Sequence, residues 1–161
     1  MKKINFALFG IITVGLVFWF FMIRGHQDGP YKRYSKGQLT EEGTFRDGKL
    51  EGPFKMYFKG GQLGAEGTYR DGKEEGPVKV YYKSGQLKEE GTYKNDKPEG
   101  PYKMYYESGQ LQEEGVSRDG KPEGPVKSYY ASGQLKEESI YKNGKEVGNS
   151  KKYKEDGSLM Q

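Results

Sequence analysis

The sequence predicts an all-β fold, an elongated single antiparallel sheet made of about six tandem copies of one β-hairpin. Two periodic signals predict it. The triplet Gly-Gln-Leu recurs every 24 residues, and a Gly-Pro pair recurs between the triplets at nearly the same interval. A fixed period of about 20 to 50 residues is typical of a repeat array, in which each unit buries its apolar side against its neighbours. The triplets begin at Gly37, Gly61, Gly85, Gly109 and Gly133, and a degraded copy begins at Gly157.

The hairpin is clearest in the third unit. Two β-prone stretches, residues 77–83 and 86–94, are separated by Ser84-Gly85. The turn that joins one unit to the next is usually Asp-Gly or Asn-Gly, and these pairs tolerate the positive φ of a type I′ turn. In residues 95 and 96 the glycine is replaced by Asp96. Each unit is therefore expected to contribute two strands, about 12 strands in all for six units.

A two-residue turn at Ser84-Gly85 fixes the cross-strand register. It pairs Lys83 with Gln86, Tyr82 with Leu87, Lys79 with Glu90, and Val78 with Gly91. The same arithmetic gives a Lys/Glu pair in each of four central units: Lys55 with Glu66, Lys79 with Glu90, Lys103 with Glu114, and Lys127 with Glu138. Exposed pairs of this kind contribute only about 0.2 to 1 kcal/mol each. We expect them to fix the register and to keep one face of the sheet solvated.

The opposite face is expected to be apolar, because side chains alternate between the two faces of a strand. It carries Phe, Val, Met and Tyr from the first strands, and Leu and Tyr from the second strands. Gly43, Gly67, Gly91 and Gly115 also lie on this face. A glycine within a strand usually marks the close approach of another group. An aromatic ring of the adjacent strand is the expected occupant.

The N-terminal segment predicts a membrane anchor. Residues 4–23 contain no charged side chain, and a helix of this length, at about 1.5 Å per residue, spans the roughly 30 Å hydrocarbon core. We predict one transmembrane helix within an uncleaved anchor of residues 1–24, a linker at residues 25–28, and the repeat array at residues 29–161. A cleaved signal peptide is the alternative, although no small-x-small cleavage site ends the run.

The predicted location is a single-pass membrane protein with its repeats on the extracytoplasmic side. Lys2 and Lys3 precede the apolar run, and a short basic tail usually stays in the cytoplasm. Arg24 and Lys32 follow the run closely, so the count of basic residues alone favours neither orientation.

Charge and composition exclude several classes of function. Three of the 27 basic residues flank the apolar run, which leaves 24 against 23 acidic side chains in the rest of the chain. Such a balance predicts no nucleic-acid partner, because counterion release needs a face of one sign. The chain has no cysteine, and therefore no disulfide, thiolate nucleophile or zinc–thiolate site.

Catalysis is not expected either. His26 is the only histidine and lies in the linker, most aspartates occupy turn positions, and Glu89 and Glu90 are neighbours that point to opposite faces of a strand. An enzyme needs activated groups that converge in a pocket. We therefore predict no catalytic residue, no metal site and no cofactor.

The repeat resembles the MORN repeat, and more closely its bacterial variant form. From Gly91 to Gly109 the sequence follows Gly-x-Tyr-x-x-Gly-Lys-x-x-Gly, then seven residues and Ser-Gly, and departs from this pattern at Asp96. The same string recurs from Gly43 and Gly67, and less faithfully from Gly115. The resemblance implies a meander of β-hairpins in one long sheet. It also implies a binding role, because such proteins are often labelled YwqK-like antitoxins or protein-interaction modules.

The predicted interaction surface is a column of tyrosines on the same face as the lysines. Its members are Tyr57, Tyr81, Tyr105, Tyr129 and Tyr153. Tyrosine combines a large apolar ring with a polar tip, which suits binding surfaces. In the alternative reading the column is a set of half-buried spacers, since tyrosine also favours strands in general.

Two hypotheses about function follow. The first is a non-enzymatic, membrane-tethered scaffold that binds a protein partner, with toxin neutralisation as one special case. The second is a cell-envelope module that recognises wall glycan or lipid headgroups through the repeated tyrosines. Wall-binding repeats usually carry tryptophan, and Trp19, the one tryptophan of this chain, lies in the apolar run. The first hypothesis is therefore preferred.

Overall fold

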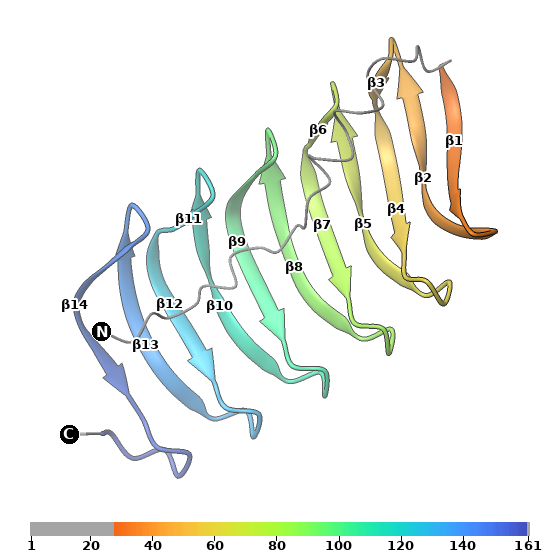
Figure 1. The fold of residues 1–161 in the computed structure, drawn as a ribbon. Coiled ribbons are helices and arrows are strands. Elements are labelled where there is room, and N and C mark those ends of the chain that lie inside the picture. Colours follow the sequence, from red (N-terminus) through yellow and green to blue (C-terminus); the bar gives the residue numbers. More distant parts are fainter. Residues whose placement is uncertain (1–27, 161) are drawn as a thin grey trace.

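The computed structural model describes residues 28–160, which form one long antiparallel sheet of 14 strands (Figure 1). Eleven strands follow one another across the sheet, and three strands of two residues each lie off this path. The strands are β1 (Gly29–Ser35), β2 (Gln38–Arg46), β3 (Lys49–Leu50), β4 (Gly52–Tyr57), β5 (Leu63–Arg70), β6 (Lys73–Glu74), β7 (Gly76–Tyr81), β8 (Leu87–Lys94), β9 (Lys97–Tyr105), β10 (Leu111–Arg118), β11 (Lys121–Pro122), β12 (Gly124–Tyr129), β13 (Leu135–Lys142) and β14 (Lys145–Lys152).

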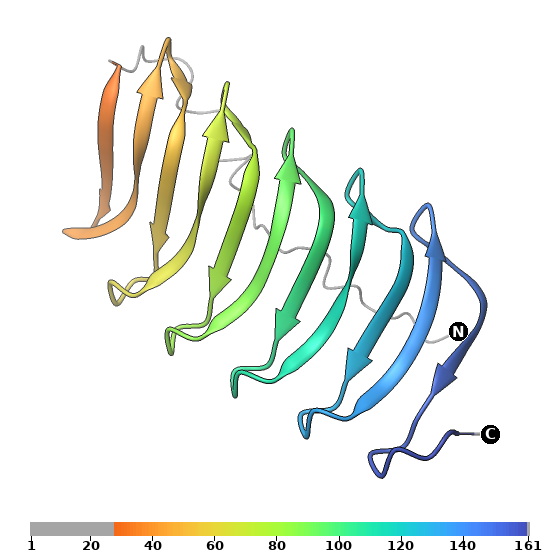
Figure 2. The ribbon, with the colours of Figure 1, turned by 180° about the vertical axis from the view of Figure 1, so that it is seen from behind.

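The sheet is a meander of six repeat units, as predicted. Unit 1 is the hairpin β1–β2, unit 2 contains β3 to β5, unit 3 contains β6 to β8, unit 4 contains β9 and β10, and unit 5 contains β11 to β13. Unit 6 is β14 followed by a short return in which Tyr153 bridges Leu159. Seen from behind, consecutive units remain side by side along the whole sheet (Figure 2).

The number of strands exceeds the expected 12 because the first strand of units 2, 3 and 5 is interrupted after two residues, whereas unit 6 contributes the single strand β14. The interruption precedes the glycine of each Gly-Pro pair. Gly52, Gly76 and Gly124 have φ angles of +79°, +92° and +80°, a conformation that glycine adopts without a steric penalty.

The fold-class prediction is wrong about its helix. The described residues form strands and turns, and none of them belongs to a helix that is long and apolar enough to cross a membrane. The physical reason is their patterning, because residues 28–160 alternate polar and apolar side chains as strands do. The predicted anchor of residues 4–23 lies outside the described residues.

The predicted register is confirmed in the middle of each hairpin. Lys55, Lys79, Lys103 and Lys127 lie opposite Glu66, Glu90, Glu114 and Glu138. Near the Ser84-Gly85 turn the prediction is wrong by one residue, because Leu87 pairs with Tyr81 instead of Tyr82. The register shifts at a bulge between Val80 and Tyr81.

A three-residue turn explains this shift. The amide of Gly85 donates to the carbonyl oxygen of Tyr82, and the amide of Tyr82 donates to that of Gln86. Gly85 alone of the three turn residues has a positive φ, at +88°. A type I turn followed by a left-handed glycine is a common three-residue hairpin connection, and it suits the twist of the strands. Units 2, 4 and 5 repeat the same hydrogen bonds.

The turns between units follow the prediction. Asp47 and Gly48 have φ angles of +50° and +70°, and Asn95 and Asp96 have +51° and +64°. Positive φ at both central residues defines the type I′ turn. Aspartate tolerates the left-handed conformation better than most residues, so unit 3 keeps its turn without the glycine.

The core is a single layer of side chains on one face of the sheet, here called the apolar face. Its buried residues are Phe45, Leu50, Phe54, Tyr69, Val78, Tyr93, Tyr102, Val126 and Tyr141. In units 1 and 2 the first four of these form one cluster, against which Tyr31 and Met56 pack.

Aromatic rings cover three of the four strand glycines, as predicted. A Cβ atom on Gly67 would lie 2.8 Å from the Phe54 ring, and one on Gly43 would lie 2.9 Å from the Tyr31 ring. Gly115 faces the Tyr102 ring in the same way. At Gly91 the prediction fails, because its partner in the hairpin is Val78, which has no ring.

Candidate interaction surface

The second face of the sheet carries a continuous row of alternating charge. Each glutamate of the row lies between a lysine of its own hairpin and a lysine of the next unit, as Glu66 does between Lys55 and Lys79. The row consists of Lys32, Glu42, Lys55, Glu66, Lys79, Glu90, Lys103, Glu114, Lys127, Glu138 and Lys151. We call this side of the sheet the Lys/Glu face. Alternation of charge across neighbouring strands stabilises each pair modestly and keeps the face solvated.

The tyrosine column lies on the Lys/Glu face beside this row. Each hydroxyl donates a hydrogen bond to a glutamate of the preceding unit: Tyr57 to Glu42 at 2.6 Å, Tyr81 to Glu66, Tyr105 to Glu90 and Tyr129 to Glu114 at 2.7 Å, and Tyr153 to Glu138 at 3.4 Å. All five tyrosines are half-buried. The column therefore links successive units, and its role in binding stays a prediction.

The hydrogen bonds of Tyr57 and Tyr81 raise the pKa of these two tyrosines. The hydrogen bond to Glu42, with partial burial, raises the pKa of Tyr57 to about 12. Burial and the hydrogen bond to Glu66 raise the pKa of Tyr81 to about 12 as well. The hydrogen bond from Tyr57 lowers the pKa of Glu42. Tyr57 and Tyr81 are therefore neutral phenols at physiological pH, and Glu42 is an ionised carboxylate.

A shallow depression of about 270 Å³ lies on the Lys/Glu face between units 3 and 4. Pro77, Thr92 and Pro101 border it on one side, and Lys79 and Lys103 border it on either side of Glu90. It is open to solvent, and the side chains that line it do not form a catalytic arrangement. This geometry suits contact with a macromolecule rather than enclosure of a small substrate.

Two further sets of bonds hold the units in line. The carboxylates of Glu51, Glu75, Glu99 and Glu123 each accept from a backbone amide in the turn that joins their unit to the next, at 2.7–3.1 Å. At the opposite end of the strands, the hydroxyls of Tyr82, Tyr106 and Tyr130 donate to carbonyl oxygens of the next unit. Sequence reasoning missed these roles, although the 24-residue recurrence of both residue types was a visible signal.

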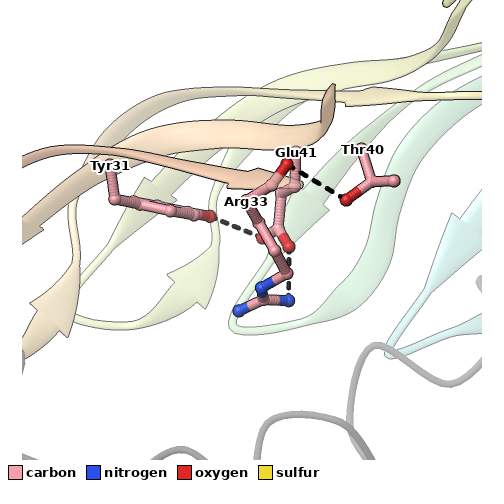
Figure 3. A network of polar contacts seen from close by, with 4 residues as sticks. All are labelled: Tyr31, Arg33, Thr40 and Glu41. Atoms are coloured by element: carbon pink, nitrogen blue, oxygen red, sulfur yellow. Dashed lines mark hydrogen bonds and ion pairs between the residues drawn. The ribbon is translucent and has the colours of Figure 1, made fainter. Parts of the chain in front are cut away.

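Buried carboxylates on the apolar face were also missed. Glu41, Glu74 and Glu89 are buried there, and Glu41 points away from its neighbour Glu42, as alternation predicts. Glu41 accepts from the Tyr31 hydroxyl at 2.5 Å and pairs with the Arg33 guanidinium at 2.6 Å (Figure 3). A charge removed from water needs partners of this kind.

Glu74 has a less favourable environment. Burial raises its pKa to about 7, and the nearby negative charge of Asp96 contributes. Burial likewise raises the pKa of Glu89 and of Glu113, and Glu113 accepts from the Tyr102 hydroxyl at 2.8 Å. Each of these carboxylates sits in a packed layer of side chains. Among the described residues no group of three or more His, Cys, Asp or Glu could hold a metal ion.

The comparison with known families matches this architecture. The MORN repeat variant pattern matches four consecutive stretches, residues 50–71, 74–95, 98–119 and 122–143, which together cover more than half of the chain. The chain belongs to the MORN repeat variant family. The matched stretches coincide with units 2 to 5 of the sheet. A comparison with curated proteins found no match.

MORN repeats are generally non-enzymatic interaction modules, and the repeated hairpins of this chain fit such a module. The family assignment agrees with the resemblance of residues 29–161 to this repeat.

Proposed function

We propose that this MORN repeat variant protein is a non-enzymatic scaffold that binds a protein partner on its Lys/Glu face. The observation that carries the proposal is the repeated set of side chains on that face, held in place by bonds between units. The apolar face uses its side chains for the core, whereas Lys55, Lys79 and Lys103 are exposed. A pre-organised, extended surface loses little entropy on binding, which favours affinity.

Membrane tethering and toxin neutralisation are narrower parts of the proposal. Tethering depends on the uncharged run of residues 4–23 and on the preceding lysines, which favour repeats on the extracytoplasmic side. Neutralisation of a toxin would be one form of partner binding, supported by the label that related repeat proteins often carry.

A site-specific cross-linker tests the choice of face. A photoreactive phenylalanine analogue is placed at Lys79, on the Lys/Glu face, or at its neighbour Val80, on the apolar face, in the full chain expressed in its native host. Irradiation is expected to cross-link the Lys79 variant to a discrete protein partner and to leave the Val80 variant uncross-linked. Equal products from both variants, or products from Val80 alone, would contradict the proposal.

The envelope-binding hypothesis is a second candidate, supported by the regular spacing of the tyrosine column. It predicts that the full chain sediments with purified wall glycan or with lipid vesicles, and that a Tyr81→Ala/Tyr105→Ala variant does not. The Lys79 cross-linker would then yield no discrete protein product.

A further inference from the structure

One row of the Lys/Glu face changes from polar to apolar along the sheet. The second strands of units 1, 2 and 3 carry threonine in this row, at Thr44, Thr68 and Thr92, whereas units 4 and 5 carry Val116 and Ile140. Val147 of β14 lies opposite Ile140 and extends the row. Val116, Ile140 and Val147 are 40%, 58% and 42% exposed. Contiguous apolar exposure of this kind marks interaction surfaces.

A cationic row runs beside the apolar one. Arg118 and Lys142 follow Val116 and Ile140 by two residues in the same strands, so they project from the same face. They lie opposite Lys121 and Lys145. Like charges in directly opposed positions destabilise a sheet, so this arrangement favours an anionic partner.

Some lysines of these opposed pairs have an acidic partner at the neighbouring turn, and others do not. Lys49 reaches Asp71 at 3.3 Å and Lys97 reaches Asp119 at 3.8 Å. Lys73 and Lys121, by contrast, have Asn95 and Asn143 at the corresponding turn positions. Within residues 28–160, no ion pair involves Arg118, Lys121, Lys142 or Lys145. Cations without an ion pair and exposed apolar side chains therefore lie next to each other in units 4 to 6.

We propose that Val116, Ile140 and Val147 dock an acidic amphipathic α-helix of a partner protein, laid across the strands. This inference rests on the proposed scaffold function and names the part of the Lys/Glu face that carries it. The apolar residues come from β10, β13 and β14, with exposed Pro125 of β12 between them. These four strands are successive in the sheet (Figure 1).

The spacing of the row selects a helix over an extended peptide. Neighbouring strands lie about 4.8 Å apart. A helix brings a side chain back to the same face about every 5.4 Å, whereas an extended strand does so about every 6.7 Å. A helix therefore stays in step with the row over four strands, and acidic residues along its flank reach Arg118 and Lys142. In this mode of recognition an amphipathic helix binds through apolar side chains at positions i, i+3, i+4 and i+7.

The test uses a synthetic probe and the full chain. The probe is a fluorescent amphipathic helical peptide of about 18 residues, roughly five turns, with leucines along one face, glutamates along both flanks and alanine elsewhere. Its fluorescence anisotropy is measured as the protein is added. We expect saturable binding that weakens about tenfold, or 1.4 kcal/mol, in the Val116→Thr/Ile140→Thr variant. Threonine is the residue that units 1 to 3 carry in this row, so the fold is retained, as circular dichroism can verify.

Two controls isolate the surface. A Tyr34→Thr variant removes an exposed apolar side chain of β1, 59% exposed, and should leave the affinity unchanged. A peptide with lysine in place of every glutamate should bind about tenfold more weakly. The Lys142→Glu/Lys145→Glu variant should reverse this preference between the two peptides.

Three results would overturn the proposal. These are absence of binding, equal affinity of the Val116→Thr/Ile140→Thr and Tyr34→Thr variants, and equal affinity of the acidic and basic peptides. Self-association in sedimentation velocity that the double variant abolishes would assign the row to a second copy instead. The cross-linking experiment at Lys79 tests the scaffold function separately. If Lys79 cross-links to a protein partner but one of these results is obtained, the helix-binding site is wrong and the scaffold function still stands.

Discussion

The two ends of the sheet differ in the apolar side chains that each face carries. In units 1 and 2, Phe45, Leu50, Phe54 and Tyr69 form a buried cluster on the apolar face, and the Lys/Glu face shows threonines. In units 4 to 6 the apolar face has buried Ser117 and Ser139, while Val116, Ile140 and Val147 are exposed on the other face. Burial stabilises the fold, whereas exposure of apolar surface supports binding. The N-terminal units therefore hold the buried cluster of aromatic and leucine side chains, and the C-terminal units expose the apolar row to which we assign the binding site.

The largest expected effect comes from the N-terminal cluster. Phe54 is 4% exposed, and its ring packs on Gly67 and lies 4.6 Å from the ring of Tyr69. A Phe54→Ala variant should lose about 3–5 kcal/mol of unfolding free energy. Val126→Ala, at the equivalent position of unit 5, should lose roughly 1–2 kcal/mol because fewer carbon atoms are removed. Urea denaturation of the full chain measures both, and equal losses would contradict the asymmetry.

Glu74 is the exception within the N-terminal half, and it makes stability depend on pH. It occupies the position that Leu50 fills in unit 2, and burial raises its pKa to about 7 from 4.5. The folded protein therefore holds this proton more tightly than the unfolded chain does. Stability contributed by the neutral acid is present below about pH 4.5 and is lost as the pH rises to about 7.

A Glu74→Gln variant should remove this dependence. At pH 8 it should be more stable than the wild type by on the order of 2–3 kcal/mol, since each pKa unit corresponds to about 1.4 kcal/mol. At pH 4 the two proteins should differ little. Urea denaturation at both values of pH measures the difference. A gain of the same size at pH 4 and pH 8 would show that charge at residue 74 is not the cause, and Glu146→Gln, at the exposed equivalent position of unit 6, is the matched control.

Gly67 and Gly91 offer a smaller and more local contrast. A Cβ atom on Gly67 would meet the Phe54 ring at 2.8 Å and Val78 Cγ2 at 3.0 Å, whereas one on Gly91 would meet Tyr102 Cβ at 3.5 Å. Gly67→Ala should therefore lose about 1–3 kcal/mol by overpacking. Gly91→Ala should be neutral or gain up to about 0.5–1 kcal/mol, because alanine loses less conformational entropy in a strand. The unfolding midpoints in urea of the two variants give the comparison, and a loss at Gly91 equal to that at Gly67 would contradict the ring-on-glycine account.

Much of this contrast was predictable from residues that recur. The 24-residue period, the Lys79/Glu90 register and the placement of Tyr81 on the lysine face follow from alternation and turn chemistry alone. Departures from the period were harder to interpret. The exposed row at Val116 and Ile140 replaces threonine by residues of similar β-propensity, so its importance emerges only when the register aligns the strands.

The turn at Gly85 and the carboxylate of Glu74 depended on context that the sequence does not display. A two-residue and a three-residue turn differ in which backbone amide bonds which carbonyl. Burial of Glu74 follows from its pairing with Tyr69 across β5 and β6. Residues 4–23 lie outside the described residues, so the predicted helix has no support from the part of the chain that the structure describes.

The smallest expected change in stability is also the sharpest test of the comparison between the two ends. Thr92→Val extends the apolar row of units 4 and 5 into unit 3, at a site that is exposed and already pairs with Pro77. Stability should change by no more than about 0.5 kcal/mol, as is usual for surface substitutions. Affinity for the acidic helical peptide should rise about fourfold, because one added apolar group in a contact of this kind is worth roughly 0.8 kcal/mol. Thr92 lies one unit before Val116, whereas Thr44 lies three units before it. The same substitution at Thr44 should therefore leave the affinity unchanged. Anisotropy titration of both variants distinguishes the two explanations. A continuous apolar surface is extended only by Thr92→Val, whereas non-specific hydrophobic binding would raise both affinities alike.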